Sequence, residues 1–259
     1  MTLKKQNKIN IKIDPFNTDF SKKWSWMALG RTLLNAAEIH AKARGFGMSN
    51  VNSENSTWVL SRLCIEMIEM PKVWDSVYVN TWIDNIFRLF TNRNFSIKSS
   101  DGTVFGYARS IWALIDYNTR ETINLAEMHG DDLSIYIDVD EPCPIEPQGR
   151  VKPLEDSYWI KDIKAEYTDI DLNGHVNSIK YIEHILNLFP IEKFKGKHEL
   201  KRFEIAYMAE SYYHDDLSLY KRKINDNVYE VEIKKKIKDI EHDKSYSLEP
   251  LVRSKLIFS

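Results

Sequence analysis

The sequence predicts an α+β fold made of two consecutive units, each a single helix packed on an antiparallel sheet. Strand-like alternation of apolar and polar residues covers most of the 259 residues, and only two long helical patterns interrupt it. The order strand, helix, four strands occurs once on each side of residues 138–153, a segment with four prolines. We therefore expect domains at residues 1–138 and 156–259, joined by a linker at residues 139–155.

The first unit begins with an edge strand before about Phe20, in which Ile9, Ile11 and Ile13 alternate with polar residues. A helix is expected from Trp24 to Arg44, where Gly45 and Gly47 stop it. Its apolar stripe consists of Leu29, Leu33, Leu34, Ala37, Ala41 and Ala43. Turn residues then separate four predicted strands at 57–69, 75–84, 87–99 and 104–117.

The second unit repeats this order without obvious sequence identity to the first. A strand is expected at 158–167, and a helix from Asn177 that Pro190 stops. Four strands follow, with a hairpin turn at 225–227: 199–211, 216–223, 228–238 and 248–258.

The polar segment 169–177, before the second helix, concentrates residues that can carry chemistry. It contains Asp169, Asp171, Asn173 and His175. The first N–H groups of a helix lack partners within the helix and can hold an anion, and histidine moves protons near neutral pH. The segment is therefore a candidate catalytic loop.

Two other interpretations of this segment remain open from the residues alone. Asp169, Asp171, Asn173 and Gly174 occupy positions 1, 3, 5 and 6 of a calcium-binding loop, but position 12 is Lys180 instead of the glutamate that such a loop requires. A lysine at this place argues strongly against calcium. The other interpretation is a capped turn with a surface histidine.

The composition excludes several classes of protein. The net charge of −2 gives no sign of nucleic-acid binding, and no segment has the length and hydropathy of a membrane span. The first residues lack an apolar signal core, so we expect a cytoplasmic protein. The two cysteines form neither a disulfide framework nor a metal-ligand cluster. The basic run 234–236 fits a solvated strand face better than a docking patch for an acidic partner.

Residues 171–181, Asp-Leu-Asn-Gly-His-Val-Asn-Ser-Ile-Lys-Tyr, resemble the D-x-N-x-H-V-N-N-x-K-Y signature of the acyl-acyl-carrier-protein thioesterases. Residues 33–45, 58–62, 71–82 and 205–211 resemble further segments of that family in the same order. The resemblance implies a double hot-dog fold and hydrolysis of the thioester that joins a fatty acyl chain to the phosphopantetheine arm of acyl carrier protein. It also implies that the first half holds the acyl chain, that the second half is catalytic, and that no metal or organic cofactor takes part.

The resemblance assigns a catalytic set of Asp171, Asn173, His175 and Glu210. His175 would shuttle a proton, and Glu210, on the strand expected at 199–211, would be a partly buried base that activates water. Asn173 would orient water or donate to the thioester carbonyl, while Asp171 positions its neighbours. The N–H groups near Val176 and Asn177 would form the oxyanion hole.

Ser211, His40 and His184 stand outside the assigned catalytic set. Ser211 stands where plant members often have cysteine, and no adjacent base activates it, so direct attack by water is favoured over a covalent intermediate. His40 and His184 fit structural roles within helices. Alternative functions are an acyl-coenzyme A thioesterase and a non-catalytic acyl-binding protein on the same fold. A homodimer is also compatible with the sequence.

Overall fold

The chain divides into two compact units, Met1–Gln148 and Gly149–Ser259. The computed structural model describes residues 4–53, 55–125, 133–149, 152–195, 199–238 and 246–259, so residues 150–151 of the predicted linker lie outside the described residues. The division between the units falls inside the segment expected to be a linker, 139–155.

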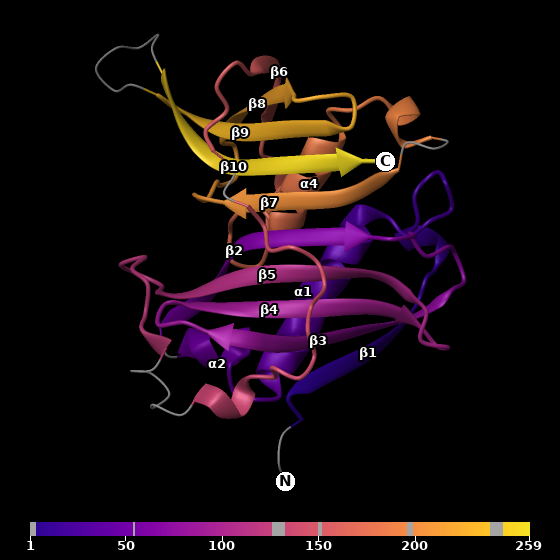
Figure 1. Ribbon diagram of the computed structural model, residues 1–259. Helices are drawn as coiled ribbons and strands as arrows, with labels where there is room; N and C mark the ends of the chain where they lie inside the picture. Colours follow the sequence, from indigo (N-terminus) through magenta and orange to yellow (C-terminus); the bar gives the residue numbers. More distant parts are fainter. Residues whose placement is uncertain (1–3, 54, 126–132, 150–151, 196–198, 239–245) are drawn as a thin grey trace. The chain divides into compact units, whose positions relative to one another are not determined.

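In the first unit an antiparallel sheet has the strand order β1-β3-β4-β5-β2. The helix α1 lies against one face of this sheet (Figure 1). The predicted edge strand, long helix and four strands are confirmed, and the short helix α2 is an addition that the sequence pattern did not predict. The elements are β1 (Gln6–Lys12), η1 (Pro15–Asn17), α1 (Trp26–Lys42), α2 (Met48–Ser53), β2 (Ser56–Met67), β3 (Ser76–Ile86), β4 (Phe90–Ser99), β5 (Val104–Asp116) and η2 (Leu133–Tyr136).

The face of α1 that meets the sheet is buried largely as its apolar stripe predicts. Leu29, Leu33 and Ala37 are buried, but Ala43 is exposed because α1 ends at Lys42. Ser25 caps the start of α1 by accepting a hydrogen bond from the N–H of Ala28. Burial of small and branched apolar side chains on one face therefore fixes which way the helix faces.

The second unit repeats the arrangement with the strand order β7-β10-β9-β8-β6 and the helix α4 on its sheet (Figure 1). The elements are β6 (Tyr158–Lys164), η3 (Tyr167–Asp169), α4 (Ser178–Leu186), η4 (Ile191–Phe194), β7 (Leu200–Tyr207), β8 (Asp216–Lys223), β9 (Val228–Lys238) and β10 (Tyr246–Phe258). The strand predicted at 199–211 is too long, because β7 ends at Tyr207. This difference changes the local setting of Glu210.

His40, on the buried face of α1, makes the stability of the first unit depend on pH. Its Nδ1 lies 2.9 Å from the Arg93 guanidinium and its Nε2 lies 3.0 Å from the carbonyl oxygen of Lys5. Burial, and then the positive charge of Arg93, lower the pKa of His40 to about 3. In the unfolded chain the pKa is about 6.5, so between these values the unfolded state binds more protons.

The contribution of His40 to the free energy of unfolding is therefore expected to be fully present above about pH 6.5. It should fall as the pH drops toward 3, by at most about 1.4 kcal/mol per pH unit. Urea unfolding of the wild-type chain at pH 7.5 and pH 5.5 measures the loss. His40→Gln, which cannot titrate, should lose less stability over the same interval. An equal loss in both proteins would contradict this assignment.

Candidate active site

The loop between η3 and α4 folds as a closed turn. Ile170 and Val176 form an antiparallel bridge, and the N–H of Asp171 donates to the carbonyl oxygen of His175 at 2.8 Å. Gly174 reverses the chain direction with a φ of +81°, a backbone conformation that residues with a Cβ disfavour. The Asn177 side chain then caps α4 by accepting from the N–H of Ile179 at 2.8 Å. The loop delivers its polar side chains directly at the helix start.

The Asp171 carboxylate braces this loop from inside. Its Oδ1 accepts hydrogen bonds from the N–H groups of Asn173, at 2.8 Å, and His175, at 3.4 Å. The expectation that Asp171 positions its neighbours agrees with these contacts. Lys180, at the place where a calcium loop needs a glutamate, lies 3.0 Å from Glu183 and 3.7 Å from Asp169. The Lys180 amino group therefore lies beside Asp169 and Glu183, at the position where a calcium loop would have a carboxylate ligand.

The side chains of His175 and Glu210, both in the predicted catalytic set, lie close together. The distance from His175 Nδ1 to Glu210 Oε1 is 3.5 Å, and the two side chains are 19% and 28% exposed. Both are therefore partly shielded yet reachable from solvent. The ring of Tyr212 contacts His175 edge to face, with 4.9 Å between the ring centroids. The imidazole is held between a carboxylate and an aromatic ring.

The prediction that Glu210 lies on a strand is wrong, whereas its expected partial burial is confirmed, since its side chain is 28% exposed. β7 ends at Tyr207, and the neighbouring Met208 is 43% exposed. Glu210 belongs instead to an irregular segment that follows the strand. Two contacts fasten this segment to the loop: the N–H of Val176 donates to the carbonyl oxygen of Ser211 at 2.8 Å, and His175 forms a bridge with Tyr212.

Asn173 completes the group of side chains. It is partly buried, and among the residues that the structure describes none forms a hydrogen bond with its side-chain amide. The amide can therefore donate a hydrogen bond to a carbonyl oxygen or orient a water molecule. Asn173 thus shares its loop with His175, the imidazole that contacts the Glu210 carboxylate.

The predicted oxyanion hole at the N–H groups of Val176 and Asn177 is wrong. The N–H of Val176 donates to Ser211, and that of Asn177 donates to the carbonyl oxygen of Asp169, both at 2.8 Å. These donors hold the loop to its neighbours and are already used. The Asn173 side chain is consequently the better candidate donor to a developing oxyanion.

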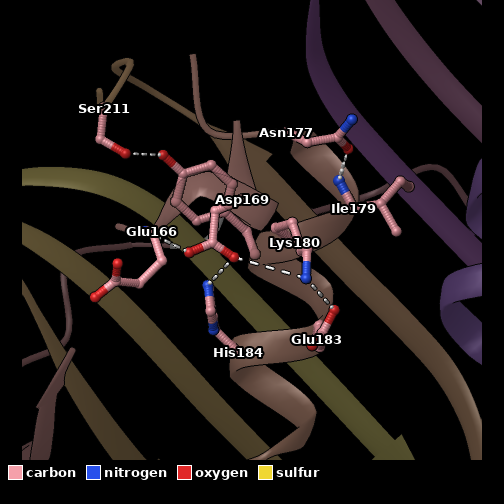
Figure 2. Close-up of polar contacts among 9 residues, drawn as sticks. Glu166, Asp169, Asn177, Ile179, Lys180, Glu183, His184 and Ser211 are labelled. Atoms are coloured by element: carbon pink, nitrogen blue, oxygen red, sulfur yellow. Dashed lines mark hydrogen bonds and ion pairs between the residues drawn. The ribbon is translucent and has the colours of Figure 1, made fainter. Parts of the chain in front are cut away.

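Ser211 is fully buried. Its side chain is 0% exposed, and its Oγ lies 2.6 Å from the hydroxyl of Tyr181 on α4 (Figure 2). Burial raises the pKa of Tyr181 to about 12, so this phenol is not a base near neutral pH. The inference that no base activates Ser211 is consistent with these contacts.

Replacing Ser211 by alanine should therefore leave kcat within about threefold of the wild type, while the free energy of unfolding falls by about 1–2 kcal/mol because the buried Tyr181 hydroxyl loses its partner. Adding Tyr181→Phe removes both polar groups and should recover part of that stability. Steady-state hydrolysis and urea unfolding measure the two effects. A loss of kcat of a hundredfold in folded Ser211→Ala would restore a nucleophilic role.

The basic run on β9 is paired with carboxylates. Lys234 lies 3.1 Å from Glu232, and Lys236 lies 2.6 Å from Asp162. The amino group of Lys235 lies 3.3 Å from Glu249 and donates to the carbonyl oxygen of Glu210 at 3.2 Å. These pairings weaken the docking-patch interpretation. They also show a role for Lys235 next to Glu210 that charge patterning could not identify, because the partners are distant in sequence.

Each unit, a helix packed on an antiparallel sheet, is a hot-dog domain, and the chain is a double hot-dog protein. Residues 4–131 match the model of the acyl-ACP thioesterase N-terminal domain, and residues 152–248 match that of the C-terminal domain. The chain therefore belongs to the acyl-ACP thioesterase family. Its membership confirms the resemblance identified from the motifs.

Similar proteins agree with this family. A crystal structure of an acyl-ACP thioesterase from Bacteroides thetaiotaomicron is 44% identical, with a TM-score of 0.86 and 98% of each chain covered. The 12:0-ACP thioesterase from Umbellularia californica has a TM-score of 0.83 at 18% identity, over 99% of this chain and 98% of that one, which shows the fold. The chloroplastic oleoyl-acyl carrier protein thioesterase 1 of Arabidopsis thaliana is 27% identical over 66% of this chain.

The match covers 51% of that Arabidopsis protein and 44% of its chloroplastic homologue, oleoyl-acyl carrier protein thioesterase 2, so the chain spans about half the length of these curated relatives. In the described part of the chain, none of the helices combines the length and apolar composition that crossing a bilayer requires.

Proposed function

We propose that this protein hydrolyses the thioester of fatty acyl-acyl carrier protein and releases a free fatty acid. The observation that carries the proposal is the contact of His175 with Glu210, on the scaffold of the acyl-ACP thioesterase family. An acyl-binding protein has no need of an acid–base set. The catalytic set is proposed to be Asp171, Asn173, His175 and Glu210.

In the proposed reaction, Glu210 takes a proton from water while the water oxygen forms a bond to the thioester carbon. The carbonyl oxygen becomes an oxyanion, to which the Asn173 amide donates a hydrogen bond. When the oxyanion collapses, the carbon–sulfur bond breaks. The departing thiolate of the phosphopantetheine arm receives a proton from His175, and Glu210 returns its own proton to His175. The products are a carboxylic acid and free carrier-protein thiol.

The geometry supports this division of roles in three ways. Glu210 and His175 are close enough to exchange a proton at 3.5 Å, so the pair can return to its starting state after each turnover. Asp171 holds the backbone of both Asn173 and His175. Ser211 is buried, and its hydroxyl is hydrogen-bonded to the hydroxyl of Tyr181, which favours direct attack by water over a serine nucleophile.

The other parts of the proposal follow from family membership. The first half, residues 1–138, holds the acyl chain, and its capacity selects chain length because each buried methylene contributes about 0.8 kcal/mol. The second half, residues 156–259, performs the chemistry. The proposed partner is acyl carrier protein, in fatty-acid synthesis, and a cytoplasmic location and a homodimer are compatible with this function.

The proposed substrate is tested by measuring hydrolysis of acyl-acyl carrier proteins of graded chain length beside the matching coenzyme A esters. We expect a higher kcat/KM for carrier-protein esters at every chain length that is hydrolysed. A preference for coenzyme A esters would favour the acyl-coenzyme A thioesterase alternative. Tight acyl binding without turnover would favour the non-catalytic alternative.

A further inference from the structure

The first unit contains a second copy of the loop that carries the proposed catalytic residues. Between η1 and α1, residues 14–25 form the same backbone hydrogen bonds as residues 166–177 between η3 and α4. Lys22 has the positive φ, +61°, that Gly174 has in the second unit. The N–H to carbonyl pairs that correspond are Asp19–Lys23 and Asp171–His175, Lys22–Asp19 and Gly174–Asp171, Ser25–Asn17 and Asn177–Asp169, and Trp24–Pro71 and Val176–Ser211.

This correspondence shows which side chains the fold itself requires. Asp19 corresponds to Asp171 and braces its loop in the same way, since its Oδ1 accepts from the N–H of Ser21 at 2.8 Å. Lys23 stands where the second unit has His175, and the residue before Pro71 is Met70 where the second unit has Glu210. The first loop therefore keeps the structural aspartate and lacks the acid–base pair.

A polar cluster around a buried carboxylate is likewise confined to the second of the two corresponding loops. The Asp169 side chain is 6% exposed, and its Oδ1 lies 3.7 Å from Lys180 Nζ and 3.4 Å from His184 Nε2, both on α4 (Figure 2). Its Oδ2 accepts from the N–H of Glu166 at 2.9 Å. The corresponding residues of the first unit are neutral: Asn17, Ala28 and Thr32.

The cluster is not explained by stability. The first loop reaches the same backbone structure with Asn17, whose amide donates to Asp14 at 2.6 Å, so the charge of Asp169 is not needed to fold such a turn. Buried ion pairs often contribute little net stability, because both charges lose their hydration. The Nε2 of His184 is also buried without a hydrogen bond, which costs free energy.

What the cluster does is connect the two ends of the loop. The carboxylate of Asp169 connects the turn before the loop to the first two turns of α4. The backbone carbonyl oxygen of Asp169 accepts a hydrogen bond from the N–H of Asn177, where the loop joins α4. Asp171, Asn173 and His175 lie between these anchors. Small shifts of such groups relative to a substrate carry large kinetic penalties.

We propose that Asp169, paired with Lys180 and in contact with His184, is a positioning residue that fixes the loop carrying Asp171, Asn173 and His175. The proposal rests on the proposed function, since it assigns the cluster to the same reaction. Asp169 touches no reacting atom in this scheme and acts through the loop backbone.

The test compares Asp169→Asn and Lys180→Met with two controls. Asn17→Ala disturbs the corresponding turn of the first unit, and Lys180→Arg keeps the cation. We expect Asp169→Asn and Lys180→Met each to lower kcat about 10–100-fold with KM within about twofold. Lys180→Arg should retain most of the activity, and Asn17→Ala should retain all of it in the folded fraction. The double variant Asp169→Asn/Lys180→Met should show a fold-loss of kcat much smaller than the product of the two single fold-losses.

Hydrogen exchange of peptides from residues 170–177 gives a readout that does not depend on activity. Exchange should be faster in Asp169→Asn and Lys180→Met but not in the two controls. If Asp169→Asn does not fold, kcat and hydrogen exchange of Lys180→Met compared with Lys180→Arg test the proposal. Normal kcat and normal exchange in a folded charge-removing variant would overturn the proposal. If the wild-type chain hydrolyses no acyl-acyl carrier protein, the proposed function fails, and the exchange comparison still decides whether the cluster holds the loop.

Discussion

His175→Ala is expected to reduce kcat for acyl-acyl carrier protein by about 10²–10⁴-fold, the usual range for loss of a general acid–base group. The imidazole lies 3.5 Å from the Glu210 carboxylate, and in the proposed mechanism it is the group that protonates the departing thiolate. KM should change little, because the imidazole acts mainly on the reacting atoms. Steady-state kinetics on one well-hydrolysed chain length measures the loss.

The matched control is Lys23→Ala, the corresponding residue of the loop in the first unit. This variant removes a side chain from the same backbone position and should leave kcat unchanged. Added imidazole should restore part of the activity of His175→Ala, because a small base can enter the space that the variant opens. Normal turnover by folded His175→Ala would remove histidine from the mechanism.

The sequence predicted the two-unit fold because the strand and helix periods are strong in each half. The alternation of Ile9 and Ile11 and the stripe of Leu29 and Leu33 each allow only one face to be buried. The prediction failed at β7, where apolar residues continue past Tyr207 although the regular pairing with β10 ends there, with the N–H of Met208 still donating to the carbonyl oxygen of Leu251. Strand ends depend on the partner strand, and one segment of sequence does not reveal its partner.

The residue pattern alone indicated the part of the site whose residues are close in sequence, whereas Glu210, which meets His175 through the fold, was predicted only by the resemblance to the family. Asp171, Asn173 and His175 stand two residues apart and share one loop. The use of the Val176 and Asn177 amides by distant carbonyl oxygens could not be read from the pattern, so the expected oxyanion hole was wrong. The role of the network around Asp169 was not predicted for a different reason: its residues are close in sequence, but the role emerges only from comparison with the corresponding loop of the first unit.

Glu210→Gln is expected to lower kcat by about 10²–10⁴-fold, because glutamine keeps the shape of the side chain and cannot accept a proton from water. Glu210→Asp keeps the carboxylate but withdraws it from His175 by one methylene, so it should show a smaller loss. Glu249→Gln serves as the control: it neutralises another carboxylate near Lys235 and should leave kcat unchanged. Stopped-flow or steady-state hydrolysis of the same substrate compares all three variants.

Glu210 and His175 act in one proton path in the proposed mechanism, so their losses should not multiply. Removing either residue already breaks the path, and the double variant His175→Ala/Glu210→Gln should be about as slow as the slower single variant. Independent roles predict instead that the two fold-losses multiply. A multiplicative result in folded proteins would separate the carboxylate from the imidazole and would require a different proton acceptor for the attacking water, because at 3.5 Å a shared path must show coupling.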